Sequence, residues 1–168
     1  CNHADQIICI SECTKRDVLK FYNVPERKVD VVYQPVSPIY YSPIEREETD
    51  PYMLYVGSVN SRKNLLGIVK AMELMPKDLQ MPLMVVGGGG SYKHQVKQYI
   101  AEHGMEHLFR WPETINNVEL RKLYSNAQLF IYPSFYEGFG LPVVEAQLCG
   151  CPVVTSNVSS LPEAGGPW

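Results

Sequence analysis

Long hydrophobic runs are missing from this chain of 168 residues. No apolar stretch approaches the roughly 18 residues that a membrane-spanning helix needs. A basic excess is missing too, because 15 Lys and Arg stand against 18 Asp and Glu, for a formal net charge of -3. Nucleic-acid-binding domains usually present a basic face, so the charge argues against a nucleic acid as partner. The opening residues, CNHADQ, lack the basic start and apolar core of a secretory signal peptide.

The cysteines follow no regular spacing. There are five of them, and a zinc site from the last four would need the spacings C-x3-C and C-x1-C, which structural zinc sites seldom use. We therefore expect reduced, partly buried thiols and no metal site. With 45% hydrophobic and 20% charged residues, the composition is that of a globular domain and excludes collagen-like, disordered and coiled-coil proteins.

The pattern that is present is that of an α/β protein. Short apolar runs alternate with amphipathic segments, which is typical of parallel strands joined by crossover helices. We predict strands at residues 7–10, 29–32, 52–56, 83–86, 108–111, 129–132 and 153–155. We predict helices at residues 14–23, with Thr14 as N-cap, and at 64–75, 91–104, 116–126 and 142–148. The expected fold class is α/β, with a Rossmann-like doubly wound parallel sheet.

Residues 34–51 differ in character from the rest. They contain prolines at positions 35, 38, 43 and 51 and a charged cluster at positions 45–48, which is typical of a linker or domain boundary. We therefore expect residues 1–50 to be the end of one domain with its linker, and residues 51–168 to form another. The chain begins without an initiator Met, so we expect it to be a piece of a longer protein.

The loop after the predicted strand 52–56 carries two adjacent cations, Arg62 and Lys63, at the start of a helix. Cations there oppose the helix dipole at a cost of about 0.3–1 kcal/mol each, unless an anion is shared with the helix amides. A phosphate group would offset that cost. In doubly wound sheets, ligands bind outside the carboxyl ends of the strands, where this loop lies. The alternative, two solvated surface cations, stays open.

Two more loops lie at the same edge of the predicted sheet. The run of glycines at 87–90 lets the backbone approach a ligand, or else makes a tight turn, but it does not match the G-x-G-x-x-G of nicotinamide-binding domains. The next loop carries Glu137 and leads to Glu145, with seven residues between them. This pair of carboxylates can accept hydrogen bonds from the vicinal hydroxyls of a ribose or hexose. Alternatively, Glu145 only complements a helix N-terminus.

The segment PSFYEGFGLPVVEAQLCGCPVVTSNVSSLPEAGG, residues 133–166, resembles the signature of retaining glycosyltransferases of the GT-B architecture, the group-4 class. Glu137 and Glu145 match its E-x7-E element. VGSVNSRKNL is similar to the strand and basic loop of that class, and residues 4–25 are similar to the end of its acceptor-side domain. The resemblance implies the C-terminal half of such an enzyme. Residues 1–50 would then be the end of the N-terminal acceptor-side domain with the interdomain linker, and 51–168 the nucleotide-sugar-binding domain, truncated at its C-terminus.

The resemblance also implies a role for each loop. Catalytic roles fall to Glu137, which contacts the donor sugar, and to Arg62 and Lys63, which face the diphosphate. Glu145 contacts the ribose. Ser58 stands where many members carry an arginine, so the phosphate contact rests on the other two cations. The remaining donor-binding residues that the resemblance implies are Gly57, Gly88, Gly138, Phe139, Gly140 and Leu141.

The implied function is that of an enzyme of class EC 2.4. It would transfer a hexose such as mannose or glucose from a nucleotide diphosphate sugar to a saccharide or lipid-linked acceptor, in polysaccharide biosynthesis. Because no D-x-D motif occurs, we expect no metal and no other cofactor. The expected location is the cytoplasm, with peripheral association at the inner face of the membrane left open. We expect this piece alone to be inactive. A nucleotide-sugar-binding module without activity and a GT-B epimerase or phosphorylase relative are the alternatives.

Overall fold

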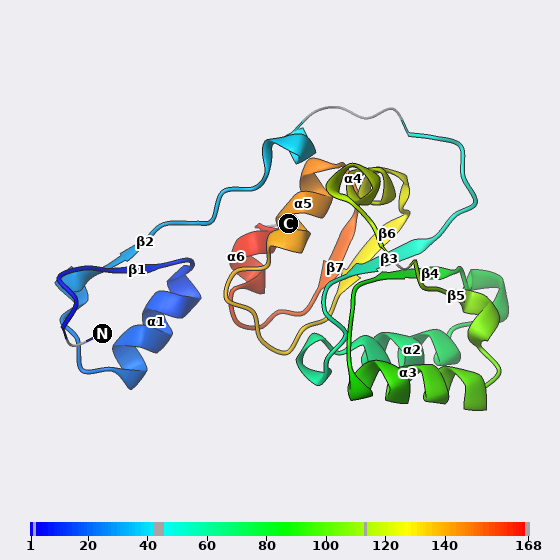
Figure 1. Cartoon of the computed structure of the whole chain (residues 1–168), viewed down its shortest axis with the longest axis horizontal. Helices are drawn as coiled ribbons and strands as arrows, with labels where there is room; N and C mark the ends of the chain where they lie inside the picture. Colours follow the sequence, from blue (N-terminus) through cyan, green and yellow to red (C-terminus); the bar gives the residue numbers. More distant parts are fainter. Residues whose placement is uncertain (2, 42–45, 113, 167–168) are drawn as a thin grey trace.

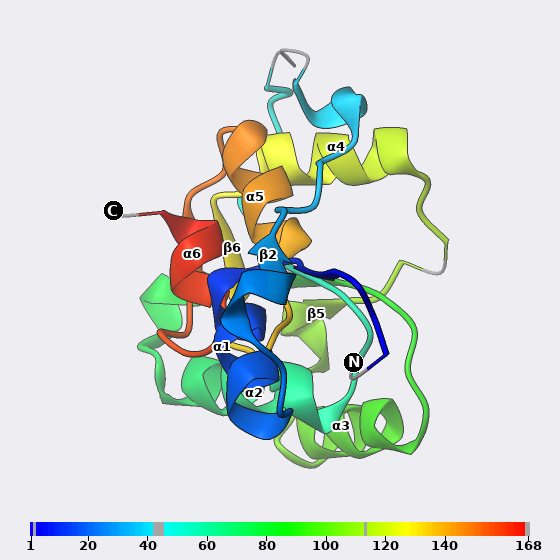
Figure 2. The same cartoon turned by 90° about the vertical axis from the view of Figure 1, so that its left-hand side faces the viewer.

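The computed structural model describes residues 1, 3–41, 46–112 and 114–166 (Figure 1). Its amino-terminal part is a β-α-β unit, in which the parallel strands β1 (Ile7–Cys9) and β2 (Val29–Val31) are connected by helix α1 (Glu12–Phe21). After β2 the chain reaches the 3-10 helix η2 (Pro38–Tyr41), whose Tyr40 packs in the core of a larger α/β domain (Figures 1 and 2). Residues 42–45 of the predicted linker lie outside the described residues, and the domain boundary at residue 50 stays a prediction.

Helix α1 begins earlier than the sequence indicated. Its N-cap is Ser11, whose side chain accepts a hydrogen bond from the Thr14 backbone N–H at 3.0 Å. The prediction of Thr14 as N-cap is therefore wrong. Ser11 has the extended backbone of an N-cap residue, with φ -160°, and a serine oxygen there satisfies one of the free N–H groups of the first turn. The helix thereby starts at Glu12.

The larger domain contains a five-stranded parallel sheet with the order β5-β4-β3-β6-β7. Strand β3 pairs with β4 along its whole length, from Met53 opposite Leu83 to Val56 opposite Val86. On its other side β3 pairs with β6, so the order reverses between β3 and β6. This is the predicted doubly wound fold, and the reversal marks its ligand-binding edge. The strands are β3 (Met53–Val56), β4 (Leu83–Val86), β5 (Phe109–Arg110), β6 (Leu129–Tyr132) and β7 (Val153–Thr155).

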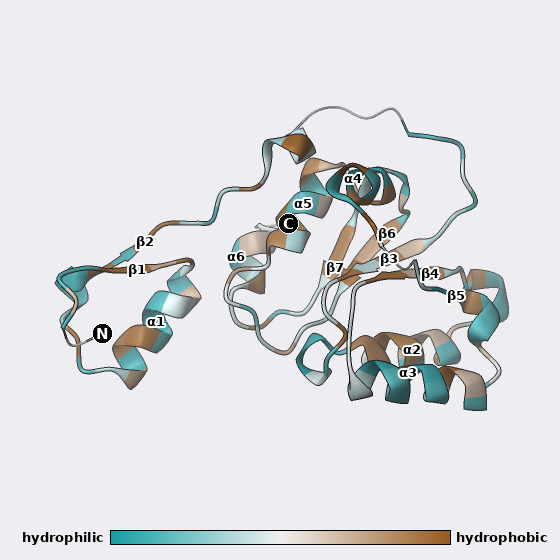
Figure 3. Ribbon diagram, viewed as in Figure 1, coloured by the Kyte–Doolittle hydropathy of each residue, from teal (hydrophilic) through white to brown (hydrophobic). Residues whose placement is uncertain are grey.

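Helices cover both faces of this sheet. One face is covered by α2 (Leu65–Leu74) and α3 (Ser91–Glu102). The other is covered by α4 (Asn117–Asn126), α5 (Leu141–Leu148) and α6 (Leu161–Gly165), of which α6 was not predicted. In Figure 3, α2 is mostly hydrophobic and the outer helix α3 largely hydrophilic. None of the helices in the described part of the chain has the length and hydropathy of a membrane span.

Strand β3 is the centre of both hydrophobic cores. Met53 and Tyr55 pack against α2 and α3, whereas Leu54 and Val56 pack in the core with α4 and α5. Every residue of β3 is buried. This is expected for the middle strand of a parallel sheet, because helices cover both of its faces. The continuous apolar run YMLYV that predicted the strand follows from this two-sided burial.

The glycine run after β4 has a structural role at its first position. A Cβ on Gly87 would lie 2.0 Å from the carbonyl oxygen of Gly57, and Gly87 has φ +148°, which side chains disfavour. Only glycine lets the ends of β3 and β4 approach this closely. Gly87 therefore allows the end of β4 to approach the start of the loop after β3, and residues 87–89 form no turn. Gly88 is exposed, and a Cβ there would meet nothing within 4 Å.

We predict that Gly87→Ala destabilises the protein by about 2 kcal/mol or more, because it combines backbone strain with a clash against a carbonyl oxygen. Gly88→Ala is the matched control, with an expected effect within about 0.5 kcal/mol. Urea denaturation of both variants checks the difference. Equal unfolding midpoints would show that the ends of β3 and β4 can separate without cost.

Candidate functional site

The loops after β3 and β6 lie side by side, because these two strands are neighbours at the point of reversal. The first loop contains a 3-10 turn, η3 (Ser61–Lys63), whose N-cap Asn60 accepts a hydrogen bond from the Lys63 backbone N–H at 3.1 Å. The second loop is bonded to it directly, since Phe135 N donates to Arg62 O at 2.8 Å. The two loops therefore form one surface at the carboxyl edge of the sheet.

Lys63, Arg62 and Glu137 meet on this surface. Lys63 Nζ lies 3.0 Å from Glu137 Oε1, and Arg62 Nη1 lies 2.9 Å from the same oxygen. Lys63 is 8% exposed and Glu137 9%, and a buried charge requires a partner. The alternative of two solvated surface cations is therefore wrong for Lys63, whereas Arg62 is exposed. The structure thus brings together the three residues for which we predicted catalytic roles.

Tyr132, the last residue of β6, completes this cluster. Its buried hydroxyl accepts a hydrogen bond from Lys63 Nζ and donates one to Glu137 Oε1 at 3.1 Å. Lys63 Nζ also lies 4.6 Å from the centroid of the Tyr132 ring, a cation–π distance. The local pattern predicts a strand at residues 129–132 but assigns Tyr132 no role in the site. The available signal was its position as the last strand residue at the ligand-binding edge.

The charges of the cluster determine the ionisation of Glu137. Burial raises the pKa of its carboxyl group, but hydrogen bonds from Lys63 and Arg62 outweigh burial and lower this pKa below its ordinary value. The backbone of Glu137 is fixed as well. Its N–H donates to Ser159 Oγ at 2.9 Å, and Ser160 Oγ donates to its carbonyl oxygen at 2.8 Å. Glu137 is therefore an ionised carboxylate in a fixed position.

Glu145 lies in a different environment. It is the fifth residue of α5, and its Oε2 accepts a hydrogen bond from the hydroxyl of the buried Tyr124 at 3.1 Å. Burial raises the pKa of Glu145, and the hydrogen bond from Tyr124 offsets this only in part. The alternative role of complementing the N-terminus of α5 is not supported, because the first turn of this helix contains no acidic residue. Pairs of acids whose pKa values are shifted in opposite directions are typical of functional sites.

The remaining predicted residues surround this cluster. A Cβ on Gly57 would lie 3.1 Å from Lys63 Cδ, so Gly57 gives the lysine side chain its path toward Glu137. Gly140 is the N-cap of α5, and Leu141 is its first residue. Phe139 is buried, and its carbonyl oxygen accepts a hydrogen bond from Ser160 Oγ at 3.0 Å. The donor contacts of these residues, and those of Gly88 and Gly138, stay predictions.

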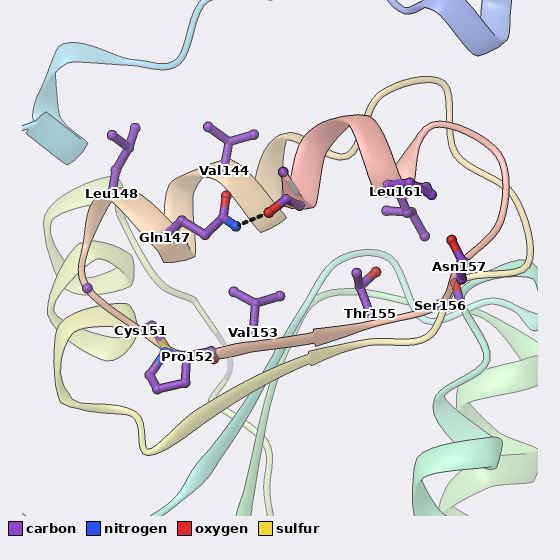
Figure 4. A pocket seen from close by; sticks show the side chains of 14 residues that line it. Val144, Gln147, Leu148, Cys151, Pro152, Val153, Thr155, Ser156, Asn157 and Leu161 are labelled. Carbon is purple, nitrogen blue, oxygen red and sulfur yellow. Dashed lines mark hydrogen bonds between the residues drawn. The ribbon is translucent and has the colours of Figure 1, made fainter. Parts of the chain in front are cut away.

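A pocket of about 910 Å³ lies elsewhere, along the edge strand β7 between α5 and α6 (Figure 4). Val144, Val153 and Leu161 line it, and Gln147 Nε2 donates to Gly165 O at 2.7 Å beside it. Neither Lys63 nor Glu137 is among its lining residues. The charged cluster, and not the size of a cavity, therefore identifies the candidate site.

Known proteins are similar to this chain in both sequence and fold. The family described as glycosyl transferases group 1 matches residues 40–168. The O-antigen chain mannosyltransferase B of Escherichia coli is 34% identical over an alignment of 175 residues. The alignment covers 97% of this chain and 46% of that protein.

Two solved structures match the fold over 95% of this chain and 46% of theirs. WaaG, a glycosyltransferase involved in lipopolysaccharide biosynthesis, has a TM-score of 0.83 at 21% identity. Anabaena HepE, solved in complex with UDP and glucose, has a TM-score of 0.82 at 18% identity. These matches confirm the predicted fold class, that of a GT-B glycosyltransferase domain. The chain spans under half the length of these relatives. On the match over residues 40–168, the chain belongs to the glycosyl transferases group 1 family.

Proposed function

We propose that this chain is the donor-binding part of a retaining glycosyltransferase of family 4. The full-length enzyme transfers a hexose, such as mannose, from a nucleotide diphosphate sugar to a saccharide or lipid-linked acceptor. The observation that carries the proposal is the convergence of Lys63 and Arg62 on Glu137 at the point of strand reversal, where ligands of doubly wound sheets bind. Membership of the family and a mannosyltransferase as relative support hexose transfer.

In this proposal, the diphosphate of the donor replaces Glu137 as the partner of the two cations. In the structure, Lys63 and Arg62 are both paired with Glu137. A diphosphate attracts the two cations away from Glu137, whose carboxylate then accepts hydrogen bonds from the sugar hydroxyls. Lys63 keeps an anionic partner before and after this exchange, so its buried ammonium is not left unpaired. When the sugar–phosphate bond breaks, negative charge grows on the diphosphate, and the two cations stabilise it electrostatically.

Glu145 binds the ribose in the same proposal. Its carboxylate has one neutral hydrogen-bond donor, Tyr124, and its raised pKa shows that burial disfavours the charged form. The vicinal hydroxyls of a ribose supply further donors to this carboxylate. HepE, whose structure contains UDP and glucose, supports a nucleotide and a sugar as neighbouring ligands. The charge of the diphosphate is matched by side chains, and we propose no metal cofactor.

We further propose that the enzyme acts in the assembly of a surface polysaccharide. The support is the O-antigen mannosyltransferase among the relatives and the lipopolysaccharide enzyme among the similar structures. A cytoplasmic site of action, at or near the inner face of the membrane, stays a prediction.

The proposed function predicts that nucleoside diphosphates and their sugars stabilise this chain against heat, whereas nucleosides do not. A ligand that binds the folded state at 100 times its Kd adds about 2.7 kcal/mol of stability. Thermal shifts with UDP, GDP, ADP and their hexose conjugates measure this response. The diphosphate that gives the largest shift identifies the preferred base and is the one used in the experiments below. Equal shifts with nucleoside and diphosphate would contradict a diphosphate site.

Transfer itself is tested with the full-length protein. The anomeric configuration of the glycoside product, measured by NMR, decides between retention and inversion. Turnover of the nucleotide sugar without an acceptor would point instead to an epimerase.

A second prediction concerns the two cations. Lys63→Met and Arg62→Ala are each expected to weaken binding of the selected diphosphate about tenfold or more, because each removes a charged hydrogen bond. Only Lys63→Met is expected to lower stability, by about 1–3 kcal/mol, since it leaves the buried Glu137 with fewer partners. Calorimetry and urea denaturation check both effects. Lys77→Met, which removes an exposed charge after α2, is the control, and unchanged affinity in both site variants would place the phosphates elsewhere.

A third prediction concerns Glu145. Because its folded-state pKa is raised, the buried charge costs stability at neutral pH, and this cost disappears as the pH falls through that pKa. Glu145→Gln is therefore expected to raise the melting temperature at pH 7, with a gain that shrinks toward pH 4, and to weaken nucleoside diphosphate binding. Melting curves across this pH range and calorimetry measure the two effects. A less stable variant with unchanged affinity would show that Glu145 has a structural role only.

A further inference from the structure

The amino-terminal end of α1 is held by a residue from the far end of the chain. The carboxylate of Glu163, in α6, accepts hydrogen bonds from the backbone N–H groups of Glu12 and Cys13, each at 2.8 Å. Helix N-termini carry free N–H groups and partial positive charge, so a carboxylate there forms charge-assisted bonds. Figure 1 shows this end of α1 turned toward the loops around α6. Glu163 thus joins the β-α-β unit to the larger domain.

The same end of α1 contacts the loop that carries Glu137, residues 136–140, which we call the donor loop. Thr14 Oγ1 donates a hydrogen bond to the carbonyl oxygen of Gly138 at 3.2 Å. Ile10 packs over the same residue, because a Cβ on Gly138 would lie 3.1 Å from Ile10 Cδ1. Glycine at this position therefore allows the close approach of the amino-terminal unit to the loop.

Two aromatic residues extend this contact. The hydroxyl of Tyr136 donates a hydrogen bond to the carboxylate of Asp17 on α1. The ring of Tyr33, just after β2, lies 5.3 Å from the ring of Phe139, centroid to centroid. Ser160 Oγ also donates hydrogen bonds to the backbone of the loop. The donor loop is thus held by both the β-α-β unit and the N-cap residue of α6.

We propose that Glu163 is a positioning residue for donor binding: by holding the N-terminus of α1, it seats the amino-terminal unit on the donor loop and fixes the loop beside Lys63. The proposal rests on the proposed function, because it assigns that loop to the donor. A loop that is already ordered loses less entropy when a ligand binds. Glu163 contributes to affinity in this way through α1, without contact to the donor.

Cys13 provides a reporter for this contact. Its thiol is 8% exposed, and burial, followed by the charge of Asp17, raises its pKa, with Glu163 also within electrostatic range. Cys1 is exposed and Cys151 is buried in the core of the larger domain. Removing the charge of Glu163 also lowers the pKa of Cys13, so the alkylation rate of Cys13 reports release of α1 once it is divided by the thiolate fraction. Alkylation of Cys151 reports unfolding of the larger domain.

The first experiment measures alkylation of Cys13 by mass spectrometry in Glu163→Ala and Glu163→Gln. Glu163→Ala removes the two backbone hydrogen bonds, a hydrogen bond from Tyr33 and an ion pair with Arg16. This loss is expected to speed Cys13 alkylation at least about tenfold. Glu163→Gln keeps an acceptor oxygen and is expected to lie between this variant and the wild type. Cys151 stays protected in both, and Glu106→Gln, an exposed change of the same kind, behaves as the wild type. Unchanged Cys13 reactivity, or an equal rise at Cys151, would overturn the proposal.

The second experiment tests whether release of α1 reaches the donor loop. Amide hydrogen exchange of a peptide spanning residues 136–141 is expected to speed up in the order Glu163→Ala, Glu163→Gln, wild type, from fastest to slowest. Affinity for the selected nucleoside diphosphate is expected to fall in the same order, about fivefold or more for Glu163→Ala. A faster Cys13 reaction with unchanged loop exchange would overturn the positioning role. Hydrogen exchange of the donor loop is measured without nucleotide. A wild type that binds no diphosphate would therefore contradict the proposed function, whereas the exchange rates would still test whether Glu163 fixes the loop.

Discussion

The buried ion pair between Lys63 and Glu137 is the interaction on which the candidate site depends. A buried ammonium and a buried carboxylate each need a polar partner, and here they serve each other, because either one without a partner would bear a large desolvation cost. The pair therefore fixes the loop after β3 to the loop after β6, which are encoded about 70 residues apart. Tyr132 and Arg62 share the same carboxylate and make its position more definite. This arrangement lies where the strand order reverses, so the fold and the charges select the same edge of the sheet.

The two glutamates of the E-x7-E element illustrate how environment separates identical side chains. Glu137 is next to two cations and has a lowered pKa, whereas Glu145 is next to a neutral phenol and has a raised pKa. The first is suited to exchanging partners with a charged ligand. The second is a partly buried carboxylate that costs stability when charged, which is typical of residues in functional sites.

The amino-terminal unit belongs to the same arrangement. Glu163 holds α1, and α1 lies against the donor loop, while Ser159 and Ser160, just before α6, bond to the backbone of that loop. The start of α6 therefore supports the donor loop in two ways, directly and through α1. The residues that hold the loop therefore also hold the neighbouring unit.

The sequence alone determined the strands, most helix positions, the doubly wound class and the charged residues of the site. Two-sided burial makes a central strand such as β3 continuously apolar. The helix predicted at residues 116–126 was confirmed, and it begins with a local signal, a capping box of Asn116 and Glu119 whose partners are three residues apart. Tertiary structure decided the burial of Lys63, the role of Tyr132 and the contact of Glu163 with α1. These depend on partners that are 69 to 151 residues distant, and local patterns carry no information about which distant backbone or side chain will be adjacent. The N-cap of α1 was mispredicted for a local reason, because Ser11 and Thr14 are both good N-cap residues. Only the extended backbone of Ser11 identifies it as the N-cap.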